Sequence, residues 1–288
     1  MERDDILYAL MNVEDFPTLP QVVMQVISVC EDEKSDANDL ARIVSHDQSI
    51  SSRILKLSNS AYYGYLKKVN TISKAVTILG FDTIKSLAIS ASVFDMFKKI
   101  KSNYNFDRVQ YWIHSIGVAS ISRMIGRTLN QSRQQLEVIF MGGLLHDIGK
   151  LFFESYYLSK YEDVMKEITV NRCTILEGEL KVFGVGHPEV GGRLTERWHF
   201  PDDLIAAIMY HHDLKSCPAE LRQLTCIVHV ADHLCRAHNI GSGGDSMPHP
   251  IDPLALETLG IPDTGVADLS DRVPDLKEQI FTFLTIMD

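Results

Sequence analysis

The sequence has few cysteines, no excess of basic residues and no long apolar run. Its five cysteines are odd in number, lack CxxC spacing and are spread along the chain, which excludes a disulfide framework and is typical of reduced thiols. Lysine and arginine number 28 against 38 acidic residues, and the net charge of −10 disfavours a protein that coats nucleic acid or an anionic membrane. No apolar run is long enough for a membrane span, and the acidic N-terminus is no signal peptide. We therefore expect a cytoplasmic protein.

Strand-like alternation is also absent, and helical periodicity with helix-capping residues replaces it. Candidate N-caps are Asp36, Asp47 and Thr71. The 288 residues, 45% of them hydrophobic, can bury a sizeable core. We expect an all-α protein of two packed helical subdomains: 1–105 as the N-terminal part, 106–240 as the second, and 241–288 as a linker and C-terminal helical tail.

Composition marks two connections between these parts. The charged, polar segment 98–108 predicts a solvated connection between the two halves. Glycine and serine dominate 241–246, which predicts a flexible linker. A helix near 274–287 either caps the domain or mediates dimerisation, and the sequence leaves this open.

The most informative stretch is Gly143-Leu-Leu-His-Asp-Ile-Gly-Lys150. Apolar residues upstream repeat at three and four positions, so His146 and Asp147 lie near the end of a buried helix, and Gly149 is expected to end it. Lys150 lies one turn beyond His146 on the same side. The imidazole and the carboxylate can converge on one divalent cation, which would make the buried charge tolerable. A hydrogen-bonded His–Asp pair that only stabilises the core is the alternative.

Further candidate ligands lie in four other segments. His114 shares a helix face with apolar residues, and His187 precedes Pro188 in a loop before a helix. His211 and His212 follow an apolar helix, and spacing does not choose between them. Asp232 lies in an apolar helix and needs a cation or hydrogen-bond donors. The flanking residues His229 and His233 either chelate an ion themselves or act as supporting or surface groups.

A DNA-binding motif is the least favoured interpretation of the N-terminal half. Residues 39–57 faintly resemble a helix-turn-helix, with Ser51, Ser52, Arg53 and Lys56 as candidate DNA contacts. The turn lacks glycine, the second helix has only two cations, and the chain is acidic. Packing of two short helices in a bundle explains the same pattern.

The ordered set His114, His146-Asp147, His187, His211-His212 and Asp232 resembles the HD superfamily of metal-dependent phosphohydrolases, whose minimum pattern is H…HD…D. The additional histidines are similar to those of the HD-GYP branch, which hydrolyses cyclic di-GMP. The glycine-tyrosine-proline stretch of that branch is absent, since His212 is followed by Asp-Leu-Lys-Ser-Cys-Pro218.

Other stretches resemble the HDOD family more closely, over about residues 15–240. They are Leu19-Pro20, Ile43-Val-Ser-His-Asp47, Leu55-Lys-Leu-Ser-Asn-Ser-Ala-Tyr-Tyr63 and Ala75-Val-Thr-Ile-Leu-Gly80. HDOD domains are all-helical bacterial signalling output modules. Many members have lost the metal ligands, whereas this chain keeps a full set.

The resemblance implies a site for two metal ions in an HD-type helical bundle. Asp147 would bridge the ions; His114, His146 and Asp232 would bind one, and His187, His211 and His212 the other. Lys150 would stabilise charge on a phosphate. A shell so rich in histidine suits iron, manganese, zinc or nickel better than magnesium.

The resemblance also implies a function. It favours a regulatory module that binds a signalling protein. The alternative is a phosphohydrolase acting on a phosphate-containing small molecule, namely a nucleotide or cyclic dinucleotide, with Asp147 and Lys150 in catalytic roles. A DNA-binding regulator is the weakest interpretation.

Overall fold

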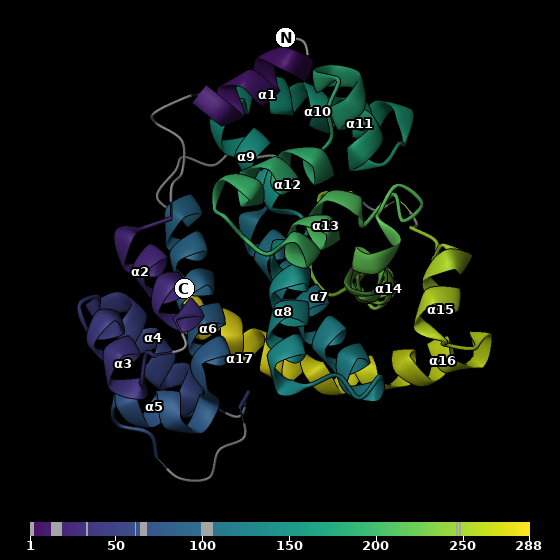
Figure 1. Cartoon of the computed structure of the whole chain (residues 1–288). Helices are drawn as coiled ribbons and strands as arrows, with labels where there is room; N and C mark the ends of the chain where they lie inside the picture. Colours follow the sequence, from purple (N-terminus) through teal and green to yellow (C-terminus); the bar gives the residue numbers. More distant parts are fainter. Residues whose placement is uncertain are drawn as a thin grey trace. The chain divides into compact units, whose positions relative to one another are not determined.

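The computed structural model describes residues 3–12, 19–32, 34–60, 62–63, 68–98, 106–245, 247 and 249–288, and these contain helices and no β-strand. The chain divides into two compact units (Figure 1). The large unit comprises Met1–Phe16 and Ile100–Lys277, and the small unit comprises Pro17–Lys99 and Glu278–Asp288. The all-α fold class is confirmed. The division of the chain expected at residues 105 and 240 stays a prediction.

The small unit contains six helices within the described residues: α2 (Gln21–Glu31), α3 (Ala37–Ser45), α4 (Gln48–Ser58), α5 (Ile72–Leu79), α6 (Phe81–Lys98) and α17 (Lys277–Met287). Asp36, Asp47 and Thr71 accept backbone N–H groups at the starts of α3, α4 and α5, as predicted. The ring of Phe283 on α17 lies 5.1 Å from that of Tyr62. The end of the chain therefore returns to the unit in which α2–α6 lie.

Arg53, a candidate DNA contact, is bound within the small unit. Its guanidinium donates to Oδ1 of Asp95 at 2.8 Å and to the carbonyl of Ala91 at 3.3 Å, both on α6. Its side chain is 12% exposed. The residue joins α4 to α6, which favours the bundle interpretation of this segment.

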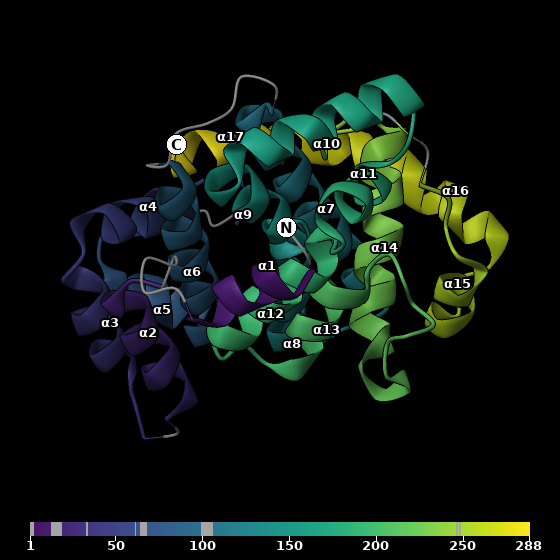
Figure 2. The ribbon, with the colours of Figure 1, turned by 90° about the horizontal axis from the view of Figure 1, so that it is seen from above.

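The large unit consists of α1 (Arg3–Asn12), α7 (Arg108–Thr128), α8 (Arg133–Leu145), α9 (Ile148–Tyr156), α10 (Leu158–Asn171), α11 (Ile175–Phe183), α12 (His187–Arg197), α13 (Asp202–Tyr210), η1 (Ala219–Leu221), α14 (Arg222–Ala237), α15 (Pro253–Leu259), α16 (Asp263–Arg272) and η2 (Val273–Leu276). Helix α7 is buried along nearly its whole length and packs against α8 and α14. In Figure 2, α12, α13 and α14 lie next to one another, with α15 and α16 beyond α14.

One local expectation, that Gly149 ends a helix, was wrong. The turn falls at His146 and Asp147, and Gly149 lies in α9. A Cβ atom at Gly149 would lie 2.1 Å from the carbonyl oxygen of His187, so glycine allows α12 to approach α9 closely. Helix α11 begins separately from α10, because Thr174 and Glu177 form a capping box at its start.

The two predicted connections have different outcomes. Segment 98–108 lies largely outside the described residues. Residues 241–245, expected to be a flexible linker, pack inside the large unit, where the Asp245 side chain is fully buried and pairs with Arg236. The composition of this segment does not reveal the ion pair, because its partner Arg236 comes from α14.

Within the part of the chain that the structure describes, no single helix is both long and apolar enough to cross a membrane. Helices α5 and α6 are long and apolar enough only when taken together, and the pair is bent by 119°.

Candidate metal centre

Five helices or helix ends bring the predicted ligands to one place in the large unit. His114 lies in the middle of α7, and Asp232 lies on α14. His146 and Asp147 form the corner between α8 and α9. His187 is the first residue of α12, and His211 and His212 directly follow α13. All seven residues belong to groups whose possible ligand atoms lie within 4.8 Å of one another.

Asp147 is at the centre of this cluster. Its Oδ1 lies 3.2 Å from Nε2 of His187 and 3.6 Å from Nε2 of His211. Its Oδ2 lies 3.2 Å from Nε2 of His146 and 3.7 Å from Nε2 of His114. The two carboxylate oxygens therefore face two different sets of imidazoles, which is the arrangement that a bridging carboxylate requires.

Hydrogen bonds orient three of the rings. Nδ1 of His146 lies 2.8 Å from the carbonyl of Gly143, and Nδ1 of His211 lies 2.8 Å from that of Ile208. Nδ1 of His187 lies 2.6 Å from Oε2 of Glu179, which also accepts the backbone N–H of His187. Each ring thus has one nitrogen engaged and the other directed at Asp147, as in metal-binding histidines.

The nitrogens that face the cluster have no hydrogen-bond partner among the described residues. This holds for Nε2 of His114, His146, His187, His211 and His212, and also for Oδ1 of Asp147. Buried polar atoms normally have a partner, because leaving one unsatisfied costs about 1–3 kcal/mol. Convergent imidazole nitrogens without a hydrogen-bond partner among the described residues, next to two carboxylates, fit a divalent cation of the iron, zinc, manganese or nickel type.

Burial and neighbouring charges shift the titration of the cluster. Burial lowers the pKa of His211 to about 3, and burial with the adjacent His211 and His187 holds the pKa of His212 well below its usual value. Burial alone would raise the pKa of Asp147, but His146 and Lys150 hold it well below its ordinary value. Neutral imidazole and ionised carboxylate are the forms that bind metals.

Two cations lie beside the acids of the cluster. The ammonium of Lys150 is fully buried and donates to Oδ2 of Asp147 at 2.6 Å. Nε of Arg236 donates to Oδ1 of Asp232 at 3.0 Å, and its NH1 to Oδ1 of Asp245 at 3.2 Å. Each acid of the cluster thus has a cation beside it, Lys150 at Asp147 and Arg236 at Asp232.

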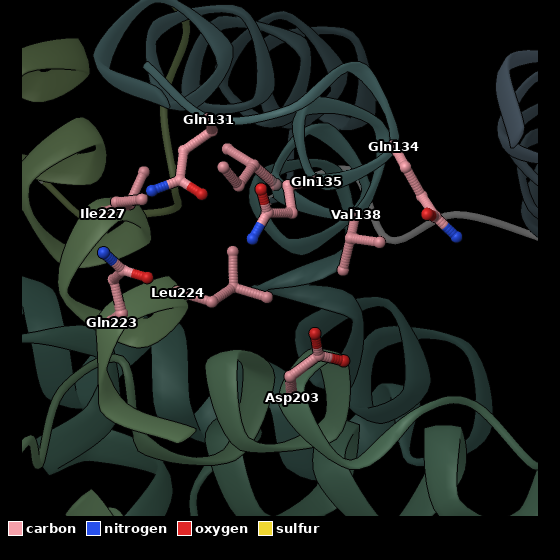
Figure 3. A pocket seen from close by; sticks show the side chains of 9 residues that line it. Gln131, Gln134, Gln135, Val138, Asp203, Gln223, Leu224 and Ile227 are labelled. Atoms are coloured by element: carbon pink, nitrogen blue, oxygen red, sulfur yellow. The ribbon is translucent and has the colours of Figure 1, made fainter. Parts of the chain in front are cut away.

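The centre is closed to solvent. The side chains of His114, His146, Asp147, His187 and His211 are at most 1% exposed. A cavity of about 570 Å³ adjoins it, lined by Arg236, Asp245 and His249 among others. Figure 3 shows another cavity, of about 250 Å³, bordered by glutamines and Asp203. No predicted ligand lines this second cavity.

The structure decides between the two interpretations of His229 and His233. Nδ1 of His229 lies 2.8 Å from the carbonyl of His211, and its Nε2 accepts the N–H of Asp252 at 2.9 Å. Nδ1 of His233 lies 2.7 Å from the carbonyl of His249. Both histidines therefore hold backbone near the cluster, which is the supporting role.

Sequence reasoning missed two residues of the site. Glu179 on α11 accepts hydrogen bonds from His187. The only indication of this role in the sequence is a glutamate within an apolar helical segment. His249 groups with His212 and Asp232 as a third set of possible ligands. It lies in a proline-flanked stretch after the glycine-rich segment, where no helical periodicity marked it as buried.

Comparison with known proteins identifies the fold and the family of the chain. The chain matches the HDOD domain family model over residues 16–214. A crystal structure of an HDOD domain protein of unknown function from Geobacter sulfurreducens is similar with a TM-score of 0.79 and 25% identity, covering 99% of this chain and 97% of that one. A protein of Marinobacter aquaeolei VT8, provisionally described as a signal transduction protein, has a TM-score of 0.78 at 19% identity, covering 99% of this chain and 65% of that one.

A curated relative is longer than this chain. An uncharacterised protein of Treponema pallidum (strain Nichols) is 25% identical over 228 residues, which are 78% of this chain and 43% of that protein. The chain thus spans less than half of that relative. With its family model matched over more than half of its length, the chain belongs to the HDOD domain family.

Proposed function

We propose that this protein is a bacterial signalling module that acts by binding a partner protein. Its metal centre would either stabilise the fold or act as a sensing element. One observation supports it above the others. The centre combines unsatisfied buried ligand atoms with almost complete closure to solvent. The first property favours bound metal, and the second favours a structural or sensing ion over an ion that meets a substrate at every turnover. The provisional description of the Marinobacter protein supports the signalling role.

The ligand sets follow the geometry. His114, His146 and Asp232 form one group, and His187, His211 and His212 form another with Asp147. Asp147 also lies next to the first group, so we assign it as the bridge between two ions. Two such ions can activate a bound water and polarise a phosphoryl oxygen. We expect iron, manganese, zinc or nickel rather than magnesium.

A metal-dependent phosphohydrolase acting on a nucleotide or cyclic dinucleotide is the second candidate. The buried Lys150 ammonium beside Asp147 and the cavity next to Arg236 favour it, with Asp147 and Lys150 as its catalytic residues. The closed centre and the missing glycine-tyrosine-proline stretch favour the regulatory role.

Five free cysteines support placement in the reducing cytoplasm.

Elemental analysis and a hydrolysis screen test the proposal. The purified full chain is expected to contain close to two transition-metal ions, and His146→Ala is expected to lose most of them. His238→Ala is the matched control, because the His238 ring contacts Ser270 outside the cluster. With metal restored, we expect no hydrolysis of cyclic dinucleotides or bis-p-nitrophenyl phosphate. A wild-type protein that binds no metal would refute the centre. Hydrolysis that requires metal and is lost in His146→Ala and Asp147→Ala would establish the phosphohydrolase.

A further inference from the structure

The loop between α14 and α15, described at 238–245, 247 and 249–252, lies directly on the metal centre. The N–H of Ser242 donates to the carbonyl of Gln110 on α7 at 3.0 Å. A Cβ atom at Gly241 would lie 2.3 Å from the backbone nitrogen of His114. At Gly243 it would lie 2.6 Å from Arg236 and 3.2 Å from the Lys150 ammonium. Glycine therefore allows the backbone of this loop to contact the helix that holds His114.

Asp245 fastens the loop to two other elements. Its Oδ2 accepts the N–H of Ile175 at the start of α11 at 2.9 Å, and its Oδ1 accepts from Arg236 on α14. Its side chain is fully buried. A buried carboxylate with a backbone donor and a guanidinium is well satisfied, so this part of the loop needs no metal.

The second part of the loop places His249 at the cluster. His233 binds the carbonyl of His249, and His229 accepts the N–H of Asp252, so two histidines one turn apart on α14 hold the backbone on both sides of its side chain. The His249 side chain is 10% exposed. Its Nδ1 lies 3.9 Å from Oδ2 of Asp232, and its ring centroid lies 5.1 Å from that of His212.

One ring nitrogen of His249, Nε2, has no hydrogen-bond partner among the described residues. This nitrogen lies 3.5 Å from Oδ1 of Asp245. Nε2 of His212 has no such partner either. Asp232 faces His114 with Oδ1 and His249 with Oδ2. His212, Asp232 and His249 thus offer three ligand atoms within 4.8 Å of one another.

We propose that His249 is an additional ligand of the metal centre, beside His212 and Asp232, and that bound metal holds the described residues 249–252 of the α14–α15 loop against the centre. The inference rests on the proposed metal centre and extends it. Two imidazoles and a carboxylate suit a transition metal of the zinc, iron or cobalt type.

The consequence is a surface that depends on metal occupancy. Gly241, Ser242, Asp245 and His249 line the cavity of about 570 Å³ that adjoins the centre. In this proposal, His249 would hold residues 249–252 against the centre once an ion is bound. A partner protein that contacts the loop would then distinguish the loaded protein from the empty one.

Cobalt(II) titration of the full chain tests the proposal. The variants are His249→Ala, His249→Cys and the control His238→Ala, whose ring contacts Ser270. Affinity is measured by competition with a colorimetric chelator, and loop closure by hydrogen exchange of the amides at 239–250. We expect His249→Ala to weaken the affinity about tenfold or more and to abolish the slowing of loop exchange by cobalt. The control should behave like the wild type.

His249→Cys supplies a readout that a merely structural role would not change. A thiolate at this position should bind cobalt and produce a sulfur-to-cobalt charge-transfer absorption that the wild type lacks. Melting temperatures without metal show whether each variant folds. Wild-type protein that binds no cobalt would refute the metal centre itself. Wild-type binding with unchanged affinity and loop protection in His249→Ala, and no charge-transfer band in His249→Cys, would overturn only the assignment of His249.

Discussion

Glu179 offers a direct test of how the metal centre is organised, because it touches a predicted ligand without facing the cluster. Its Oε2 accepts both the backbone N–H of His187 and the proton on Nδ1, at 2.7 and 2.6 Å. Burial alone would lower the pKa of His187, but the Glu179 carboxylate raises it above the usual value. Glu179 therefore fixes the ring so that Nε2 faces Asp147, and it makes the imidazole a stronger donor.

Glu179→Gln keeps the shape of the side chain and removes its charge. Loss of such an outer partner reduces metal affinity about 10- to 100-fold. At free metal about 100 times the wild-type Kd, one site stabilises the fold by about 2.7 kcal/mol, and a tenfold weaker site by about 1.4 kcal/mol. The difference of about 1.3 kcal/mol corresponds to about 3–5 °C in melting temperature for a unit of this size.

The assay compares melting temperatures with and without added zinc or manganese, together with chelator competition for Kd. Glu177→Gln is the matched control on the same helix. Glu177 is exposed and accepts from the N–H of Thr174 in a capping box, which glutamine also forms. We expect the metal-dependent stabilisation to fall in Glu179→Gln and to stay unchanged in Glu177→Gln. Equal metal-dependent stabilisation in the two variants would refute the assigned role of Glu179.

Three further predictions concern other parts of the chain. Gly149→Ala would place a Cβ atom 2.1 Å from the carbonyl of His187; we expect a loss of about 1–3 kcal/mol or more in urea unfolding together with weaker metal binding, and wild-type stability would show that α9 and α12 are not closely packed. Arg53→Ala removes the hydrogen bonds to Asp95 and Ala91 and should lower the free energy of unfolding by about 1 kcal/mol. DNA retention at low salt should not change. A loss of salt-sensitive DNA binding would instead support the DNA-binding alternative. Cys30 is partly buried, and burial raises the pKa of its thiol to about 12. Alkylation of the folded protein should therefore stay slow from pH 7 to 9 in mass spectrometry, and rapid labelling would contradict the raised pKa.

The helices and their caps followed from local sequence where one side chain sufficed to define an end. Asp36, Asp47 and Thr71 begin helices in the structure as their sequence positions indicate. Expectations failed where the relevant contact came from a distant segment. Gly149 reads as a helix stop, but its backbone freedom serves the approach of His187, 38 positions later in the sequence. The glycines at 241–244 read as a linker, but they allow contact with α7 and with Arg236.

Apolar periodicity and capping residues by themselves determined the helical class, and stretches between residues 19 and 80 determined the HDOD resemblance. The order of histidines and aspartates determined the seven candidate ligands. The tertiary structure decided which atoms converge. It turned the Nε2 atoms of His146, His187 and His211 inward by engaging each Nδ1, and it added Glu179 and His249. The physical reason is that residue type and spacing specify what a side chain can bind, whereas its partners across the fold specify the direction in which its lone pairs point.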